Sequence, residues 1–236
     1  MEQKRNAKGE GSFKINKDGT VTHRKSVGYK ANGQRKILTV TAANKTACIR
    51  EMKKKETQIC CSIGFLTEKQ AKMLKEAGLD RINHNLNSSR SYYPNICTTH
   101  TYEQRVENIH MLQRLGFEIC SGGIIGMGES REDVVDMLLD LREINPEALP
   151  INFLIPIPGT PLAGTDTSAL TPAYCLKVLC LARLMVPKAD IRCAAGREIY
   201  FKGREKELLT VVNSIFASGY LTADGQGISD TLQMIT

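Results

Sequence analysis

From residue 57 to the end of the chain, short apolar segments alternate with helices that carry recognisable start and stop signals. Capping boxes begin at Thr67 and Thr101, and Gly78 and Gly116 stand where the helical spacing of apolar residues stops. The strands expected between these helices cover residues 58–63, 79–86, 117–121, 149–155, 189–194 and 213–216. Six strands separated by helices predict a parallel sheet with helical crossovers.

Two architectures can hold such a sheet, a doubly wound fold and a (β/α) barrel. Asn83 and Asn85 lie two residues apart on one expected strand, so they share a face of the sheet, and His84 points to the other face. Polar residues also follow several other strands, as in a barrel whose site collects the C-terminal ends of its strands. Since six strands are fewer than eight, we predict a partial (β/α) TIM-type barrel of about six parallel units.

Residues 1–56 differ from this plan in both pattern and charge. They hold 15 Lys and Arg against 5 Asp and Glu, whereas residues 57–236 hold 17 against 20. Asp18-Gly19 and Asn32-Gly33 predict tight turns between strands at 12–15, 21–29 and 35–40, and a helix is expected at 45–55. We therefore predict two domains, 1–56 and 57–236, of which the first is a small α+β domain with a three-stranded sheet and one helix.

The first domain also carries a family pattern, which is Gly9-Glu10-Gly11-Ser12-Phe13-Lys14, Lys17-Asp18-Gly19 and Gly28-Tyr29-Lys30-Ala31-Asn32-Gly33-Gln34-Arg35-Lys36. It resembles the arm-type DNA-binding domain of phage-like tyrosine integrases. The resemblance implies a basic face for DNA phosphates. A lysine-rich surface exposed to solvent is the alternative interpretation.

Bulk properties restrict the location of the chain. No run of 18 apolar residues exists, and the first 30 residues are polar, so we expect neither a membrane span nor a secretory signal. The eight cysteines show no disulfide framework, which favours a reducing, cytoplasmic compartment and thiol or metal chemistry. Four further cysteines are expected to be structural: Cys97, Cys175, Cys180 and Cys193. His100 and His110 are expected to be surface or loop residues and not ligands.

Three residues near strand ends are candidates for chemistry, namely Cys60, Cys120 and Arg192. Two thiolates can ligate iron, although a buried cysteine is more commonly a small apolar residue. The glycine-rich segment 122–129 fails the dinucleotide fingerprint, because Arg131 stands where a third glycine is needed. Either it lets the backbone approach an adenosine-like ligand, or it is a tight βα turn.

Residues 57–236 resemble the C-terminal two-thirds of biotin synthases, which are radical S-adenosylmethionine (SAM) enzymes. The matching motifs are Asn83-His84-Asn85-Leu86-Asn87, Tyr92-Tyr93-Pro94-Asn95-Ile96-Cys97-Thr98-Thr99, Cys120-Ser121-Gly122-Gly123, Pro150-Ile151-Asn152, Gly159-Thr160-Pro161-Leu162, Gly196-Arg197-Glu198 and Asn213-Ser214-Ile215-Phe216. The resemblance implies sulfur insertion into dethiobiotin by SAM radical chemistry, and a homodimer.

The resemblance also implies roles for individual residues. Three match ligands of a [2Fe-2S] cluster: Cys60, Cys120 and Arg192. Four match a pocket for dethiobiotin and SAM: Asn83, Asn85, Asn152 and, near the SAM ribose, Asn87. Asn87 stands where some family members carry Asp, which weakens that contact. The adenine-side loop corresponds to Gly122, Ile124, Gly126 and Glu129.

One family feature is absent from the sequence. The Cys-x3-Cys-x2-Cys triad that holds the family's [4Fe-4S] cluster has no counterpart, because Cys48 is the only cysteine before Cys60. We therefore expect a biotin synthase-like chain that does not make the radical alone. The alternatives are a DNA-binding fusion protein whose barrel is a passenger, and a chain without selected function.

Overall fold

The computed structural model describes residues 11–29, 34–56, 58–216 and 227–235. The chain divides into two compact units, Met1–Ile59 and Cys60–Thr236, and each is described by itself. The DNA-binding and biotin synthase-like characters assigned to residues 1–56 and 57–236 stay predictions.

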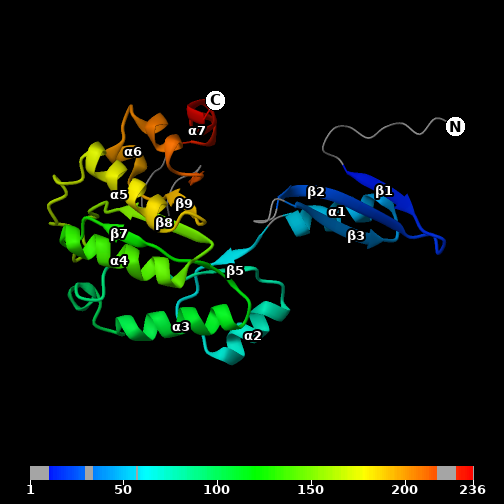
Figure 1. Ribbon diagram of the computed structural model, residues 1–236, viewed down its shortest axis with the longest axis horizontal. Coiled ribbons are helices and arrows are strands. Elements are labelled where there is room, and N and C mark those ends of the chain that lie inside the picture. The colour runs from blue at the N-terminus through cyan, green and yellow to red at the C-terminus, as the bar shows by residue number, and fades with distance from the viewer. Residues whose placement is uncertain (1–10, 30–33, 57, 217–226, 236) are drawn as a thin grey trace. The chain divides into compact units, whose positions relative to one another are not determined.

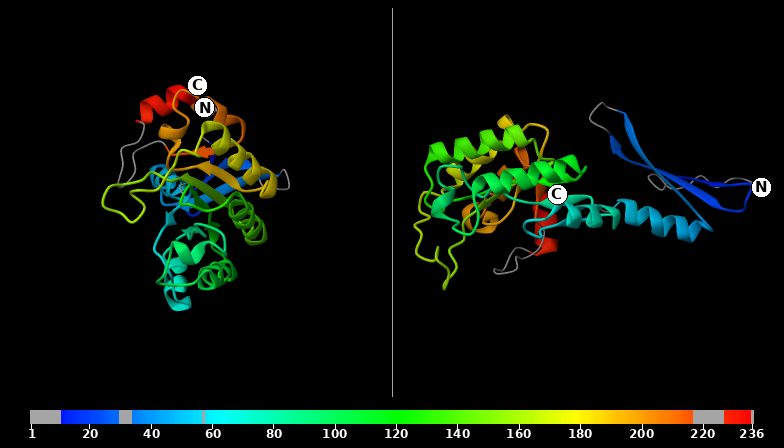
Figure 2. Two further views of the ribbon diagram at one scale, coloured as in Figure 1. Left: turned by 90° about the vertical axis from the view of Figure 1, so that its left-hand side faces the viewer. Right: turned by 90° about the horizontal axis from the view of Figure 1, so that it is seen from below.

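The first unit is an antiparallel sheet in the order β1-β2-β3, with one helix against it (Figure 2). Its elements are β1 (Ser12–Ile15), β2 (Val21–Tyr29), β3 (Arg35–Ala42) and α1 (Lys45–Glu56). A small core of Val21, Val40, Cys48 and Met52 joins the helix to the sheet. This unit confirms the predicted α+β arrangement of three strands and one helix.

The second unit is built on a parallel sheet in the order β10-β9-β8-β6-β5-β4, with β7 also paired to β8 (Figure 1). The strands are β4 (Cys60–Cys61), β5 (Arg81–Asn83), β6 (Glu118–Cys120), β7 (Gly123–Ile125), β8 (Ala148–Phe153), β9 (Asp190–Cys193) and β10 (Ser214–Ile215). The six predicted strands are all present but shorter than expected. The partial TIM-type barrel is confirmed.

Four helices cover one face of this sheet and follow one another in chain order (Figure 1). They are α2 (Glu68–Glu76), α3 (Tyr102–Arg114), α4 (Arg131–Ile144) and α5 (Pro172–Met185). Thr67, Thr101 and Ser130 form capping boxes at the first three. Shorter elements complete the unit: η1 (Tyr93–Asn95), α6 (Arg197–Tyr200), η2 (Glu205–Thr210) and α7 (Ile228–Ile235).

The two faces of the sheet differ in chemistry. Ile82, Ile119, Leu149 and Ile191 are fully buried and belong to the core with the helices. Because side chains alternate along a strand, their neighbours lie on the opposite, inner face. On β5, β6 and β9 these neighbours are polar or thiol residues, including Arg81, Asn83, Cys120 and Arg192, whereas Ala148 and Pro150 flank Leu149 on β8. The inner face is therefore where chemistry can be placed.

Among the helices of the described residues, none is long and apolar enough to cross a membrane.

Candidate functional site

Two thiols meet on the inner face of the sheet. Cys60 lies on β4 and Cys120 on β6, and β5 runs between them with Arg81 beside Cys60 and Asn83 beside Cys120. The two thiols are near enough across β5 for each to shift the pKa of the other. Asn83 Nδ2 also donates to Cys120 Sγ at 3.4 Å. The sheet register thus brings together three residues that are 23 to 60 positions apart in the chain.

Two arginines lie near this thiol pair, and one of them, Arg81, is paired with Glu118 at 2.6 Å. Arg81 and Arg192 both act electrostatically on Cys60 and Cys120. The neighbouring Cys60 thiol and the nearby guanidinium groups hold the pKa of the Cys120 thiol below its ordinary value, whereas the Cys120 thiol and burial raise the pKa of Cys60. One sulfur of the pair therefore carries negative charge more readily than an isolated thiol, as a metal ligand must.

Arg192 is held in position by neighbours on β10 and beyond. Its Nε donates to Ser214 Oγ at 2.7 Å, and its guanidinium lies 5.8 Å from the centre of the Phe216 ring. Ser214 lies directly opposite Arg192 in the register of β9 and β10. The arginine is thus fixed on the same face as the thiols.

These side chains provide some, but not all, of the ligands that a [2Fe-2S] cluster needs. Two thiols and a guanidinium converge, and biological [2Fe-2S] clusters take thiolate ligands. Within the described residues, no three His, Cys, Asp or Glu side chains gather closely enough to hold a metal ion. The thiol pair therefore fits half of a four-ligand set, and the described residues offer no three-cysteine set for a [4Fe-4S] cluster.

Asn85 and Asn152 brace the ends of the strands with their side chains. Asn85 Oδ1 accepts from the Gly122 N–H at 3.1 Å. Asn152 Nδ2 donates to the Gly123 carbonyl at 3.2 Å, and its Oδ1 accepts from the Ala195 N–H at 3.2 Å. Both amides therefore hold the strand ends together at the candidate site.

Backbone contacts fix Asn87 and Gly122 just beyond the sheet. Asn87 has a φ of 72°, its N–H donates to the Gly122 carbonyl at 3.1 Å, and its carbonyl accepts from the Ile124 N–H at 2.8 Å. A Cβ at Gly122 would lie 1.8 Å from the Pro150 carbonyl oxygen. Only glycine allows this close approach of two strands.

Glu129 closes the glycine-rich loop onto itself. Its Oε1 accepts from the Gly126 N–H at 2.7 Å, and its Oε2 accepts from the Met127 N–H at 2.8 Å. Tyr92, which the sequence did not single out as a site residue, donates its hydroxyl hydrogen to the Met127 carbonyl at 3.0 Å. The carboxylate therefore shapes the loop from within.

A cavity of about 280 Å³ adjoins this loop, lined by Gly126, Gly128, Glu129, Ser130, Arg131, Asp166, Ala169, Leu170 and Tyr174. The predicted site residues thus fall into three groups, of which the first, linked by hydrogen bonds at the strand ends, is Asn85, Asn87, Gly122, Ile124 and Asn152. Cys60, Asn83, Cys120 and Arg192 converge on the inner face of the sheet, whereas Gly126 and Glu129 belong to the loop cavity. Arg81 was missed, although its position two residues before Asn83 on the same strand placed it on the same face.

The sequence matches two family descriptions: the Radical SAM superfamily over residues 23–141, and the Biotin and Thiamin Synthesis associated domain over residues 150–236. It is 47% identical over 188 residues to a biotin synthase of Rhodopirellula baltica, covering 79% of this chain and 52% of that protein. It is 45% identical over 202 residues to a biotin synthase of Geobacillus kaustophilus, covering 85% and 59%. The chain spans between half and three-fifths of the length of these relatives.

Solved structures support the fold. The chain superposes on methylornithine synthase with a TM-score of 0.62 and 18% identity, covering 78% of this chain and 58% of that one. It superposes on HydG, a maturase of the [FeFe]-hydrogenase, with a TM-score of 0.61 and 13% identity, covering 75% and 43%. At these identities the likeness bears on the fold alone.

Proposed function

The chain belongs to the radical SAM superfamily, and we propose that its second unit forms the substrate and [2Fe-2S] side of a biotin synthase-type site, which inserts sulfur into dethiobiotin. The observation that carries this proposal is the convergence of Cys60, Cys120 and Arg192 on the inner face of a parallel sheet. Homology to biotin synthases supports it.

Cys60, Cys120 and Arg192 would hold the [2Fe-2S] cluster, which supplies the sulfur atom when bound. Arg192 offsets the negative charge of the sulfur ligands, and its bond to Ser214 fixes the direction of its guanidinium. Asn83, which donates to Cys120 Sγ, stabilises the anionic form of that ligand. These residues keep the ligands in position before the cluster arrives.

The amides and the glycine loop would bind the organic molecules. Asn83, Asn85 and Asn152 supply neutral donors and acceptors, which suit the uncharged ureido ring of dethiobiotin. Asn87 and the loop of Gly122, Ile124, Gly126 and Glu129 would receive SAM. Glu129 bonds to the backbone of its own loop, so we assign it to shaping the loop that would receive SAM.

Radical generation is not assigned to these 236 residues. The sequence contains no Cys-x3-Cys-x2-Cys segment, and the described residues do not fit a [4Fe-4S] cluster. We propose that the chain by itself does not cleave SAM. A homodimer, predicted from the resemblance, and a cytoplasmic location, predicted from the cysteine pattern, remain predictions.

Anaerobic reconstitution of the full chain with iron and sulfide tests this assignment. Because a ligand is missing, we expect at most a weak visible absorbance, which Cys60→Ser and Cys120→Ser both abolish, whereas the control Cys180→Ser, on α5 away from the inner face, retains it. We also expect no 5′-deoxyadenosine from SAM under reducing conditions. If both thiol variants retain the cluster, the ligand assignment is wrong. If the chain cleaves SAM, only the proposed inactivity is wrong.

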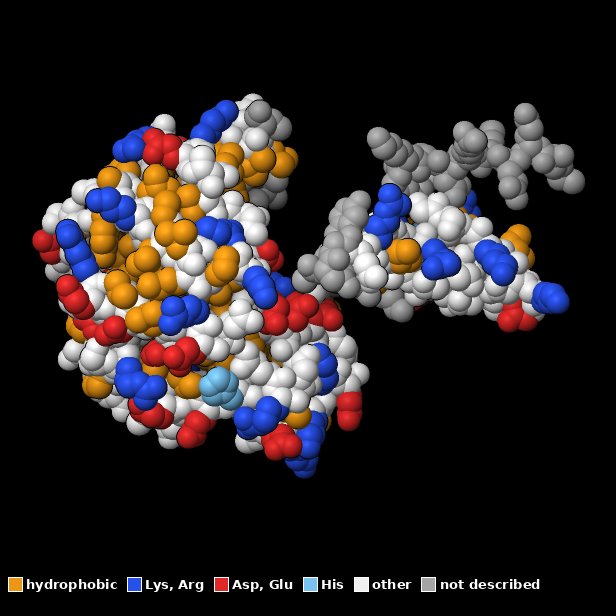
Figure 3. Space-filling model, viewed as in Figure 1, with side chains coloured by type: hydrophobic (Ala, Val, Ile, Leu, Met, Phe, Trp, Pro, Cys, Tyr) orange, Lys and Arg blue, Asp and Glu red, His pale blue; other side chains and the backbone are white. Residues whose placement is uncertain are grey.

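DNA binding by the first unit is a second candidate function. The sheet face away from the α1 core presents Lys14, Thr22, Arg24, Thr39 and Thr41, which adjoin one another in the strand register. On the face visible in Figure 3, basic side chains of this unit outnumber acidic ones. Cations interspersed with hydroxyls suit a phosphate backbone.

A gel shift with duplex DNA and the full chain tests this candidate. We expect binding that weakens steeply with salt, because each phosphate contact releases counterions. Replacing Lys14 and Arg24 together by Gln should weaken it, whereas Lys72→Gln on α2 should not. No shift at low salt would exclude DNA binding.

A further inference from the structure

A cluster of side chains around Cys97 lies outside the proposed cluster and substrate site. Cys97 is half-buried in the turn that follows η1, and its Sγ lies 3.5 Å from both ring nitrogens of His100 and 3.6 Å from Thr99 Oγ1. Tyr93 and Arg105 contact the other side of the His100 ring.

The hydrogen bonds fix the protonation of His100. Arg105 Nη2 lies 2.6 Å from His100 Nε2, and arginine can only donate, so Nε2 is an acceptor and the ring is neutral. Arg105 Nε also donates to the Tyr93 hydroxyl oxygen at 2.8 Å, and Tyr93 in turn acts on Cys97, where it lowers the pKa of the thiol. The ring proton therefore resides on Nδ1.

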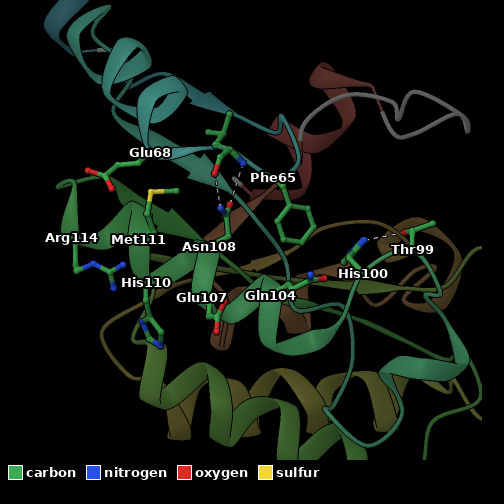
Figure 4. Close-up of a pocket in the computed structure, with 11 residues that line it drawn as sticks. Phe65, Glu68, Thr99, His100, Gln104, Glu107, Asn108, His110, Met111 and Arg114 are labelled. Atoms are coloured by element: carbon green, nitrogen blue, oxygen red, sulfur yellow. Dashed lines mark hydrogen bonds between the residues drawn. The ribbon is translucent and has the colours of Figure 1, made fainter.

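That proton begins a chain of donors that ends at the sulfur. His100 Nδ1 lies 3.0 Å from Thr99 Oγ1, a contact drawn in Figure 4, so the hydroxyl accepts from Nδ1 and can donate its own hydrogen to Cys97 Sγ. The backbone N–H groups of Thr99 and His100 add to this. Burial opposes ionisation, but these donors outweigh it and lower the pKa of Cys97 to about 7.

Open space lies next to the cluster. A cavity of about 410 Å³ is lined by Cys97, Thr98, Thr99, His100 and the ion pair of Arg90 and Glu103. A second cavity of about 770 Å³ is lined by Thr99, His100, Phe65 and the exposed side of α3 (Figure 4). A small molecule can therefore reach the sulfur from solvent.

We propose that Cys97 is a modification site that reacts with low-molecular-weight disulfides by thiol–disulfide exchange. The Cys97 thiolate attacks one sulfur of the disulfide, a new S–S bond forms to Sγ, and the old S–S bond breaks. The leaving half departs as a thiolate and takes a proton from water, so Cys97 is oxidised and the leaving half is reduced. This proposal does not depend on the function proposed for the thiol pair.

A lowered pKa increases the rate of thiol–disulfide exchange at neutral pH, because a larger fraction of the thiol is ionised. At pH 7 a thiol with a pKa of 7 is about half ionised, against about 3% for an unperturbed thiol at about 8.5. The lower nucleophilicity of the more acidic thiolate reduces this roughly 16-fold advantage to about three- to fourfold. The clearest signature is therefore the pH midpoint of the reaction, with a modest gain in rate.

The experiment treats the reduced full chain with glutathione disulfide between pH 5.5 and 9.5 and measures the occupancy of each cysteine by mass spectrometry. We expect Cys97 to form the mixed disulfide with a midpoint near pH 7 in the folded protein and about 8.5 in urea. Thr99→Val should raise the folded midpoint, whereas the control Thr98→Val, at the neighbouring residue on the same cavity, should not. The same midpoint in folded and unfolded protein, an unchanged midpoint in Thr99→Val, or no mixed disulfide at Cys97 would each overturn the proposal.

Discussion

Replacing Glu129 by Gln tests whether this side chain shapes the glycine-rich loop. In the wild type both carboxylate oxygens accept backbone N–H hydrogens, from Gly126 at 2.7 Å and Met127 at 2.8 Å. A glutamine amide has only one oxygen, so its NH2 group must face one of these N–H donors. The variant therefore loses one charge-assisted hydrogen bond and converts the other to a neutral one.

The lost bond is expected to lower the free energy of unfolding by about 1.5–3 kcal/mol. For a unit of this size that corresponds to a melting temperature lower by about 3–12 °C. Glu132→Gln is the matched control, because Glu132 is an exposed residue in the first turn of α4, three positions away. Thermal unfolding by circular dichroism provides the comparison.

Amide hydrogen exchange supplies a second, local measurement. The Gly126 and Met127 N–H groups should exchange faster in Glu129→Gln than in the wild type or in Glu132→Gln, because one of them loses its acceptor. Equal melting temperatures within about 1 °C, together with unchanged exchange at both amides, would refute the assignment of Glu129 to the loop.

Other substitutions test the packing around the site. Gly122→Ala places a Cβ 1.8 Å from the Pro150 carbonyl oxygen and should destabilise the protein by about 1–3 kcal/mol or more in urea unfolding, whereas Gly164→Ala, with open space around it, should not. Bonds from Ser130, Ser89 and Ser91 hold the pKa of Asp133 well below its usual range. Its stabilisation is therefore present above the unfolded pKa of about 3.9 and lost as pH falls through the folded pKa. The melting-temperature difference between wild type and Asp133→Asn should thus be clear at pH 7 and shrink below about pH 4; a difference that grows with acidity would contradict this.

Local signals in the sequence located the helices and strands well. The capping boxes at Thr67 and Thr101 were read from residues three positions apart, and both are formed in the structure. The break between β6 and β7 could not be read in this way. It arises at Gly122, where the backbone approaches Pro150 on β8, and that contact joins segments 28 positions apart.

The candidate site was partly predictable because strand position alone places side chains. Cys60 and Cys120 were selected as residues near strand ends, and the sheet register brings them together. Cys97 was classed as structural because nothing in its neighbourhood marks it. Its environment depends on Arg105, which reaches back from α3 to His100 and fixes the ring proton, a contact that sequence spacing does not reveal.

The division between the two faces of the sheet makes the functional tests interpretable. The stability of the second unit rests on the outer face, where Ile82, Ile119 and Leu149 are fully buried with the helices. Cys60 is exposed on the inner face, so its replacement by Ser removes little buried apolar surface and should leave folding intact. Cys120 is buried, so its replacement carries an additional packing cost. Loss of iron binding in Cys60→Ser with an unchanged melting temperature is therefore the stronger evidence for ligation, since a loss in Cys120→Ser alone could reflect a loosened sheet.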